Sequence, residues 1–386
     1  DELNNGKTFL EKSIELDNEF VEAYSEYGLI CQRLGKYELA ETNLHKAKEI
    51  AEKKNDNQGL ASIYNVLSIL YKSQGKYLKS NEHMEKALEI QLSLNNSLKE
   101  ATFRANYASC LNYLNKLELA LEQNNISIKI KESLEENHII GRSYGSMTNT
   151  YLKIGDFSKA LEFGIKALGA FRKNEMINFE ARILTLIADT YMLIGNYSQM
   201  NEYIKEAELI LSNFNEPFLN AKIELMKSRN YSQNADYDTS IDHIDNCIDF
   251  FELSEQKHFI IAAYIEKQII LIEKGEESKA NKLTLKIEMI KNKIDNPPNR
   301  PIISILKLFL ENKNIEEHFD FETISADFQT DLLLSYYYTA KFFLKDNQID
   351  KAKIYQNKAI DIMNNSAKNI SNIKDKKIFT EEEYFN

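Results

Sequence analysis

A turn signature recurs every forty residues along this chain of 386 residues. It combines glycine, or a small or amide residue in its place, with a polar residue and then, in most copies, a large apolar one. The copies are Gly35-Lys36-Tyr37, Gly75-Lys76-Tyr77, Asn115-Lys116-Leu117, Gly155-Asp156-Phe157, Gly195-Asn196-Tyr197, Ala235-Asp236-Tyr237 and Gly275-Glu276-Glu277. A fixed period of this size is typical of solenoids, in which each repeat packs only against its neighbours. We therefore expect one continuous array.

Two other sets of positions keep the same period. The set before the turn is mostly large: Cys31, Tyr71, Leu111, Tyr151, Tyr191, Tyr231 and Leu271. A set after the turn is mostly small: Ala40, Ser80, Ala120, Ala160, Met200, Ser240 and Ala280. Alternating bulky and small positions let two antiparallel helices approach closely and interdigitate. The expected fold class is all-α, a right-handed superhelical solenoid of antiparallel helix pairs.

Each repeat is expected to hold a first helix (the A helix), the tight turn, a second helix (the B helix) and a polar loop. Helices of about 16 residues would be roughly 24 Å long. The expected organisation is the second helix of an incomplete repeat in 1–20, seven repeats in 21–298, a degenerate helix pair in 299–330, a final repeat in 331–365, and a capping helix or tail in 366–386. Because the chain begins inside a B helix, we expect it to be part of a longer protein.

These residues resemble the tetratricopeptide repeat, whose ordinary form has 34 residues with a glycine at the turn and alanine after it. Ser13 and Ala47 are 34 residues apart, and the interval then widens to forty. The wider form is similar to the longer tetratricopeptide class of kinesin light chain, spindle-orientation scaffolds and the bacterial peptide-sensing Rap regulators. The resemblance implies a protein-binding solenoid. It weakens where Pro297, Pro298 and Pro301 interrupt the pattern.

Composition excludes several classes of function. A formal net charge of -11 argues against general binding to the phosphate backbone of nucleic acids, which needs a basic surface. No apolar run approaches the roughly 18 to 20 residues that span a bilayer, so we expect no membrane partner. Cys31, Cys110 and Cys247 form no CxxC pair, which favours a reducing, cytoplasmic setting.

No pattern of catalytic or cofactor-binding residues stands out. The glycines form neither a phosphate-binding loop nor a dinucleotide fingerprint, and the six histidines show no metal-ligand spacing with one another or with cysteine. Cys247 falls in a column of small residues, where a buried thiol replaces alanine. We therefore expect no enzyme activity, no cofactor and no metal site.

The candidate binding residues lie on the A helices, in columns that the core does not need. Arg142, Arg182 and Lys222 place a cation at the equivalent position of three consecutive repeats. The other candidates are Asn106, Asn149, Arg229, Lys153 and Tyr113. Arginine binds carboxylate by a bidentate fork and asparagine can bond to a peptide main chain, so the expected partner is a protein or peptide, in particular an acidic one. The alternative is that the cations only pair with acidic neighbours.

The leading functional prediction is a non-enzymatic scaffold or sensor that binds a partner peptide or helix in its concave groove. Two alternatives stay open. The chain could be the regulatory domain of a larger signalling protein, such as a transcription factor, kinase or ATPase, or it could be a peptide-responsive regulator similar to the Rap proteins.

Overall fold

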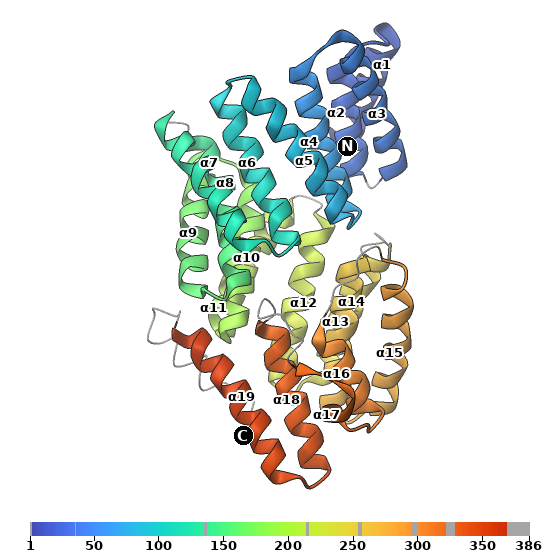
Figure 1. Cartoon of the computed structure of the whole chain (residues 1–386), viewed down its shortest axis with the longest axis vertical. Helices are drawn as coiled ribbons and strands as arrows, with labels where there is room; N and C mark the ends of the chain where they lie inside the picture. The colour runs from blue at the N-terminus through green and yellow to red at the C-terminus, as the bar shows by residue number, and fades with distance from the viewer. Residues whose placement is uncertain are drawn as a thin grey trace. The chain divides into compact units, whose positions relative to one another are not determined.

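The computed structural model describes residues 2–34, 36–134, 137–213, 216–253, 257–294, 300–321 and 329–368. Within these ranges the chain forms helices in consecutive antiparallel pairs and no strand (Figure 1). The all-α prediction of antiparallel helix pairs is confirmed. By the contacts between its residues the chain divides into two compact units, unit 1 (Asp1–Thr150) and unit 2 (Tyr151–Asn386).

The helices of unit 1 are α1 (Glu2–Leu16), α2 (Val21–Arg33), α3 (Tyr37–Lys54), α4 (Asn57–Ser73), α5 (Tyr77–Ser93), α6 (Ser97–Tyr113), α7 (Leu117–Ser133) and α8 (Asn137–Ile154), the last of which runs into unit 2. Those of unit 2 are α9 (Phe157–Lys173), α10 (Ile177–Ile194), α11 (Tyr197–Leu211), α12 (Pro217–Gln233), α13 (Tyr237–Leu253), α14 (Lys257–Glu273), α15 (Glu277–Lys291), α16 (Pro301–Leu310), α17 (Ile315–His318), α18 (Gln329–Lys345) and α19 (Ile349–Lys368). In the forty-residue repeats, even-numbered helices are A helices and odd-numbered helices are B helices.

The recurring glycine follows from the backbone at the end of each A helix. Gly75, Gly155, Gly195 and Gly275 have φ between 73° and 83°. This left-handed region costs other residues energy because their Cβ approaches the backbone. The first copy, Gly35, lies outside the described residues. The glycine column therefore marks the point where the chain must leave one helix and enter the next.

A hydrogen bond closes every one of these turns. The amide after the left-handed residue donates to the carbonyl five residues earlier, as in Lys76 N to Tyr71 O at 2.8 Å and Glu276 N to Leu271 O at 2.7 Å. This six-to-one bond is the hallmark of a Schellman helix end and satisfies a carbonyl that the helix leaves unpaired. The same bond recurs at Lys36, Lys116, Asp156, Asn196 and Asp236. The turns are thus equivalent along the array.

Two of the loops that lead from a B helix to the next A helix, those before α4 and α6, share one arrangement. Asn55 and Asn95 both take φ near 50°, a conformation that asparagine tolerates better than most residues. The next residue caps the following helix: Asp56 Oδ1 accepts from Gly59 N at 2.9 Å, and Asn96 Oδ1 accepts from Lys99 N at 3.1 Å. In these two loops the polar residues end one helix and begin the next.

The small-residue column packs as predicted. Ala40, Ala120, Ala160 and Ala280 are completely buried between helices. All three cysteines are free and buried, and burial raises the pKa of the Cys247 thiol to about 12. The prediction that Cys247 is a buried thiol in the place of alanine is confirmed.

The regular pattern changes after α15. The predicted degenerate pair contains α16, which packs against α18, and the four-residue α17. Met363 and Ala367 at the end of α19 are buried against Phe157 of α9 and Ile194 of α10, residues far away in the sequence. Residues 295–299, which include Pro297 and Pro298, and the predicted tail from 369 onward lie outside the described residues.

The turn column predicts opposite effects for two substitutions. Ala235 has a φ of 58°, so Ala235→Gly should raise the free energy of unfolding by about 1 kcal/mol. Gly275→Ala should lower it by about the same amount, because a Cβ built there meets nothing within 4 Å and only the backbone conformation is strained. Urea unfolding followed by circular dichroism measures both. Equal midpoints for the two variants would contradict this account of the turn.

Candidate functional site

The predicted cations of unit 2 lie on the A helices α10 and α12. Arg182 on α10 donates from Nη2 to both carboxylate oxygens of Glu216, at 3.0 and 3.2 Å, and Glu216 is the residue that precedes α12. The Arg182 side chain is 54% exposed. The ion pair therefore links the N-terminal parts of two neighbouring A helices at a solvent-exposed position.

Two further ion pairs link α10 to α12 and α12 to α14. Lys222 Nζ of α12 lies 3.1 Å from Asp189 Oδ2 of α10. Arg229 of α12 pairs with Glu266 of α14, and its side chain is 27% exposed against 13% for the glutamate. Burial alone would lower the pKa of Arg229, but the Glu266 carboxylate outweighs it and raises that pKa. These cations are held by acids on the adjacent A helix.

The same arrangement continues to the last helix pair. Glu273 of α14 accepts from Lys341 Nζ at 2.8 Å and from the Tyr338 hydroxyl at 2.8 Å, both on α18. Burial, followed by the charge of Glu273, raises the pKa of Tyr338. We call these three links the charge ladder of unit 2: Asp189–Lys222, Arg229–Glu266 and Glu273–Lys341. It joins α10, α12, α14 and α18 in sequence order.

The predicted polar residues of unit 1 also contact neighbouring helices. Asn106 Nδ2 on α6 donates to Asn65 Oδ1 on α4 at 2.8 Å. Tyr113 at the end of α6 stacks on Tyr77 with ring centroids 4.7 Å apart, and it remains 40% exposed. Asn149 on α8 is half-buried. These side chains lie on the A helices as expected.

Arg142 and Lys153 are exposed at opposite ends of α8, in unit 1 and unit 2 respectively. Arg142 lies near Lys131, a lysine of α7 that is only 1% exposed and donates to Ser143 Oγ at 2.8 Å. Burial and, less strongly, the charge of Arg142 lower the pKa of Lys131 to about 8. Arg142 is exposed, and its charge therefore also affects the pKa of the buried Lys131. Binding of a partner by any of the eight candidates stays a prediction.

The acids that pair with the cations were not predicted from the sequence. Asp189 and Glu266 stand in the same A-helix columns as the candidates. Asp189 and Lys222 are 33 positions apart, which is one forty-residue repeat minus about two helical turns. Arg229 and Glu266 are 37 positions apart, which is one repeat minus about one turn. A search for opposite charges at that separation could have found the ladder. In unit 2 the alternative, that the cations pair with acidic neighbours, therefore describes Arg182, Lys222 and Arg229.

Other kinds of site find little support in the part of the chain that the structure describes. It has no group of three or more His, Cys, Asp or Glu side chains that could hold a metal ion. None of the described helices is long and apolar enough to span a membrane.

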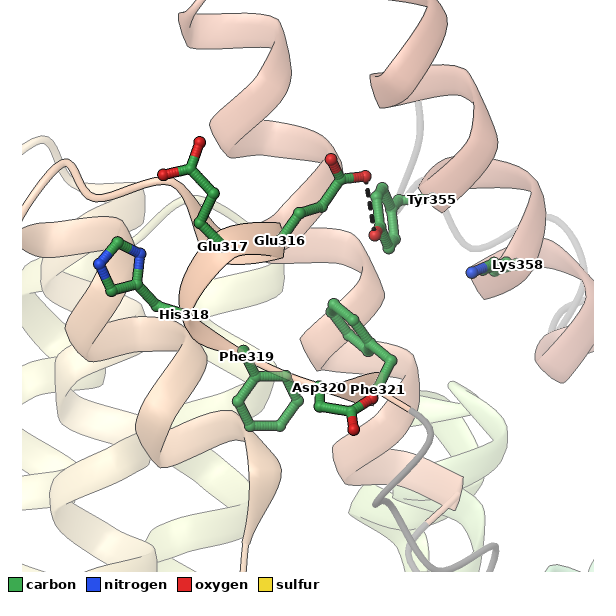
Figure 2. A pocket seen from close by; sticks show the side chains of 8 residues that line it. All are labelled: Glu316, Glu317, His318, Phe319, Asp320, Phe321, Tyr355 and Lys358. Carbon is green, nitrogen blue, oxygen red and sulfur yellow. Dashed lines mark hydrogen bonds between the residues drawn. The ribbon is translucent and has the colours of Figure 1, made fainter.

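An open depression of about 570 Å³ lies in unit 2 beside α17 and α19 (Figure 2). Its wall includes Tyr355, whose hydroxyl donates to Glu316 Oε1 at 3.0 Å, and Phe321, whose ring centroid is 5.2 Å from that of Tyr355. Lys358 Nζ already lies 5.0 Å from the centre of the Tyr355 ring. Because the chain's own side chains occupy both the aromatic face and the carboxylate, we assign no ligand to this depression.

The buried Lys131 predicts a pH dependence of stability. A folded-state pKa near 8, below the ordinary lysine value of about 10.4, means that the unfolded chain binds more protons between these values. The contribution of Lys131 to stability should therefore improve as the pH rises from about 8 to about 10, by up to about 3 kcal/mol. The measurement is the difference in unfolding free energy between wild type and Lys131→Met at pH 7.5 and 10. A difference independent of pH would contradict the lowered pKa.

The charge ladder predicts that two ion pairs differ in their effect on stability. Glu266→Gln leaves the half-buried Arg229 without its carboxylate and should lower the free energy of unfolding by about 1–3 kcal/mol. Glu216→Gln removes the partner of the exposed Arg182 and should change the free energy of unfolding by less than about 1 kcal/mol. Chemical unfolding of both variants at the same ionic strength tests this. Equal effects would show that burial does not distinguish the two pairs.

Comparisons with known proteins agree with this architecture. Residues 19–93 match the model of the tetratricopeptide repeat. A Rap protein complexed with competence and sporulation factor is similar over 95% of this chain and 98% of its own, with 14% identity and a TM-score of 0.59. NprR in complex with its cognate peptide NprX is similar over 90% and 99%, with 14% identity and a TM-score of 0.56.

Aspartyl phosphate phosphatase F from Bacillus subtilis is similar over 89% of this chain and 94% of its own, with 14% identity and a TM-score of 0.56. A search of curated protein sequences finds no match. At these identities the likeness shows the fold. The expected resemblance to the longer, Rap-like tetratricopeptide class is confirmed, and the chain has the fold of a tetratricopeptide-type helical solenoid.

Proposed function

We propose that this chain is a non-enzymatic interaction module that binds a peptide or a helical segment of a partner protein along the A helices of unit 2. The observation that carries the proposal is the charge ladder. Its side chains on α10, α12 and α14 come from columns that the apolar core does not use, and these are three consecutive A helices. The last link reaches α18. Fixed polar groups on rigid elements lose little conformational freedom when a ligand binds.

Paired charges still offer hydrogen bonds to a ligand. A guanidinium carries five N–H donors, and the bonds from Arg182 to Glu216 use Nη2 alone. The remaining donors can bind peptide carbonyls or a carboxylate, while Asp189 and Glu266 oxygens can accept from main-chain amides. Arg182 is more exposed than Lys222 and Arg229, so we assign it the contact to an acidic group of the peptide. In unit 1, Asn149, Arg142 and Asn106 are the corresponding candidates.

The likeness to known structures supports a peptide as the ligand. Two of the similar proteins, the Rap protein and NprR, were solved in complex with a peptide factor or a cognate peptide. Both share the fold over nearly the whole of this chain. The three buried free thiols fit a reducing compartment, so we place the activity in the cytoplasm.

A peptide-responsive regulator is the second candidate, and the same two peptide complexes favour it. In such a protein the ligand binds one arrangement of the helices better than another and so shifts the population between them. Small-angle scattering with and without a bound peptide separates this candidate from a rigid scaffold: a regulator changes its radius of gyration on binding, and a scaffold does not.

The test is selection of peptides from a random display library on the immobilised full chain, followed by affinity measurement on variants. We expect Arg182→Glu to weaken the selected peptides at least about tenfold, which corresponds to about 1.4 kcal/mol. The matched control is Arg172→Glu on the B helix α9. Arg172 is 44% exposed and is also paired with glutamates, Glu180 and Glu206, so the change in charge and the broken ion pairs are comparable.

Affinity in the control should stay within about twofold of wild type. Equal losses of affinity in both variants would indicate a general effect of charge. Unchanged affinity in Arg182→Glu would contradict the assignment of the binding site to the A helices of unit 2. Circular dichroism on each variant verifies that the helices are intact.

A further inference from the structure

A second charged surface lies in unit 1, on the B helices, where the sequence analysis expected no site. Its floor is aromatic: the ring centroid of His83 on α5 lies 5.9 Å from that of Tyr64 and 4.9 Å from that of Tyr71, both on α4. Lys48 of α3 and Lys86 of α5 approach Tyr64 to 5.7 and 5.9 Å. The floor is therefore flanked by cations from two neighbouring B helices.

Two more lysines extend this surface along α5. Lys76 and Lys79 both lie 5.8 Å from the centre of the Tyr71 ring. We call the set Lys48, Lys76, Lys79, His83 and Lys86 the α3–α5 patch. Its four lysines outnumber the three acids beside it, namely Glu41, which accepts from Tyr71, Glu52, which pairs with Lys48, and Glu82, which lies near His83. The patch is therefore net positive on a chain whose net charge is -11.

The cations of the patch differ from those of the charge ladder. Lys48 pairs with Glu52 at 3.4 Å, but among the described residues no carboxylate lies within 4.0 Å of Lys76, Lys79 or Lys86. Glu82 of α5 is exposed beside His83 and on the same side of the helix as Lys79 and Lys86, but it forms no ion pair with them. Arg182, Lys222 and Arg229, in contrast, each have an acidic partner in unit 2. Three of the four lysines of the patch thus have no direct ion pair among the described residues.

We propose that the α3–α5 patch is a docking site for an acidic segment of a partner protein. The spacing of its cations fits an acidic helix or strand laid along α5, since Lys79 and Lys86 are seven residues, or about 10.5 Å, apart along the axis. Lysines above aromatic faces keep their charge close to an apolar floor, which suits a ligand with both carboxylates and apolar side chains. A long polyanion such as nucleic acid would also meet the acidic remainder of the chain, which disfavours it.

This proposal does not depend on the binding function of unit 2, because it involves other helices. The probe is a fluorescein-labelled peptide of twenty residues with glutamate at helical positions three and four apart and leucine on the opposite face. We expect the triple variant Lys76→Glu, Lys79→Glu, Lys86→Glu to bind the probe at least about tenfold more weakly than wild type in fluorescence anisotropy. Its binding should also depend less steeply on salt.

The matched control reverses three exposed lysines on other B helices, Lys129→Glu, Lys205→Glu and Lys282→Glu, with the same change in net charge. Affinity within about twofold of wild type in this control supports the patch. Equal losses in both triple variants, or no binding of the probe to wild type, overturn it. A single-stranded oligonucleotide that binds wild type as tightly as the peptide and is lost in the patch variant would overturn the assignment to a protein partner.

Discussion

The architecture depends on one backbone event, the left-handed residue that ends each A helix of the forty-residue repeats. At that residue the helix carbonyls lose their regular partners, and the six-to-one bond from the following amide restores one of them. Because the conformation and the bond repeat from Gly75 to Gly275, successive B helices start at equivalent places. Equivalent starts bring the small residues of each B helix opposite the large residues of its A helix. The columns of the sequence are therefore columns in space.

This regularity explains what could be predicted from the sequence. A left-handed turn needs glycine or another residue that tolerates a positive φ, and a close helix contact needs a small residue such as alanine. Both requirements therefore produce a periodic pattern in the sequence. The buried cysteines were predictable for the same reason, since Cys247 occupies an alanine column. The periodic pattern ends near Pro301. For this reason the short helix α17 and the burial of Met363 against Phe157 could not be predicted.

The charged surfaces were predicted only in part, because the two members of an ion pair do not stand at equivalent positions of successive repeats. The cations of the A helices were predicted. Their acidic partners lie on the neighbouring A helix but one or two helical turns away from the equivalent position, as Asp189 does relative to Lys222. Equally, nothing in the spacing of Lys79 and Lys86 reveals that Tyr64 and Tyr71 lie beneath them. The structure thus separates cations that stabilise contacts between repeats from cations that remain available. A formal net charge cannot make that distinction.

We propose that the A helices of unit 2 bind a peptide while the B helices support them. Hydrogen–deuterium exchange of the full chain, with and without a peptide selected on it, tests this most directly. The peptide is expected to slow exchange in α10, α12 and α14, whose polar side chains form the first two links of the charge ladder. Protection confined to the B helices α11, α13 and α15, with α10, α12 and α14 unchanged, would contradict it.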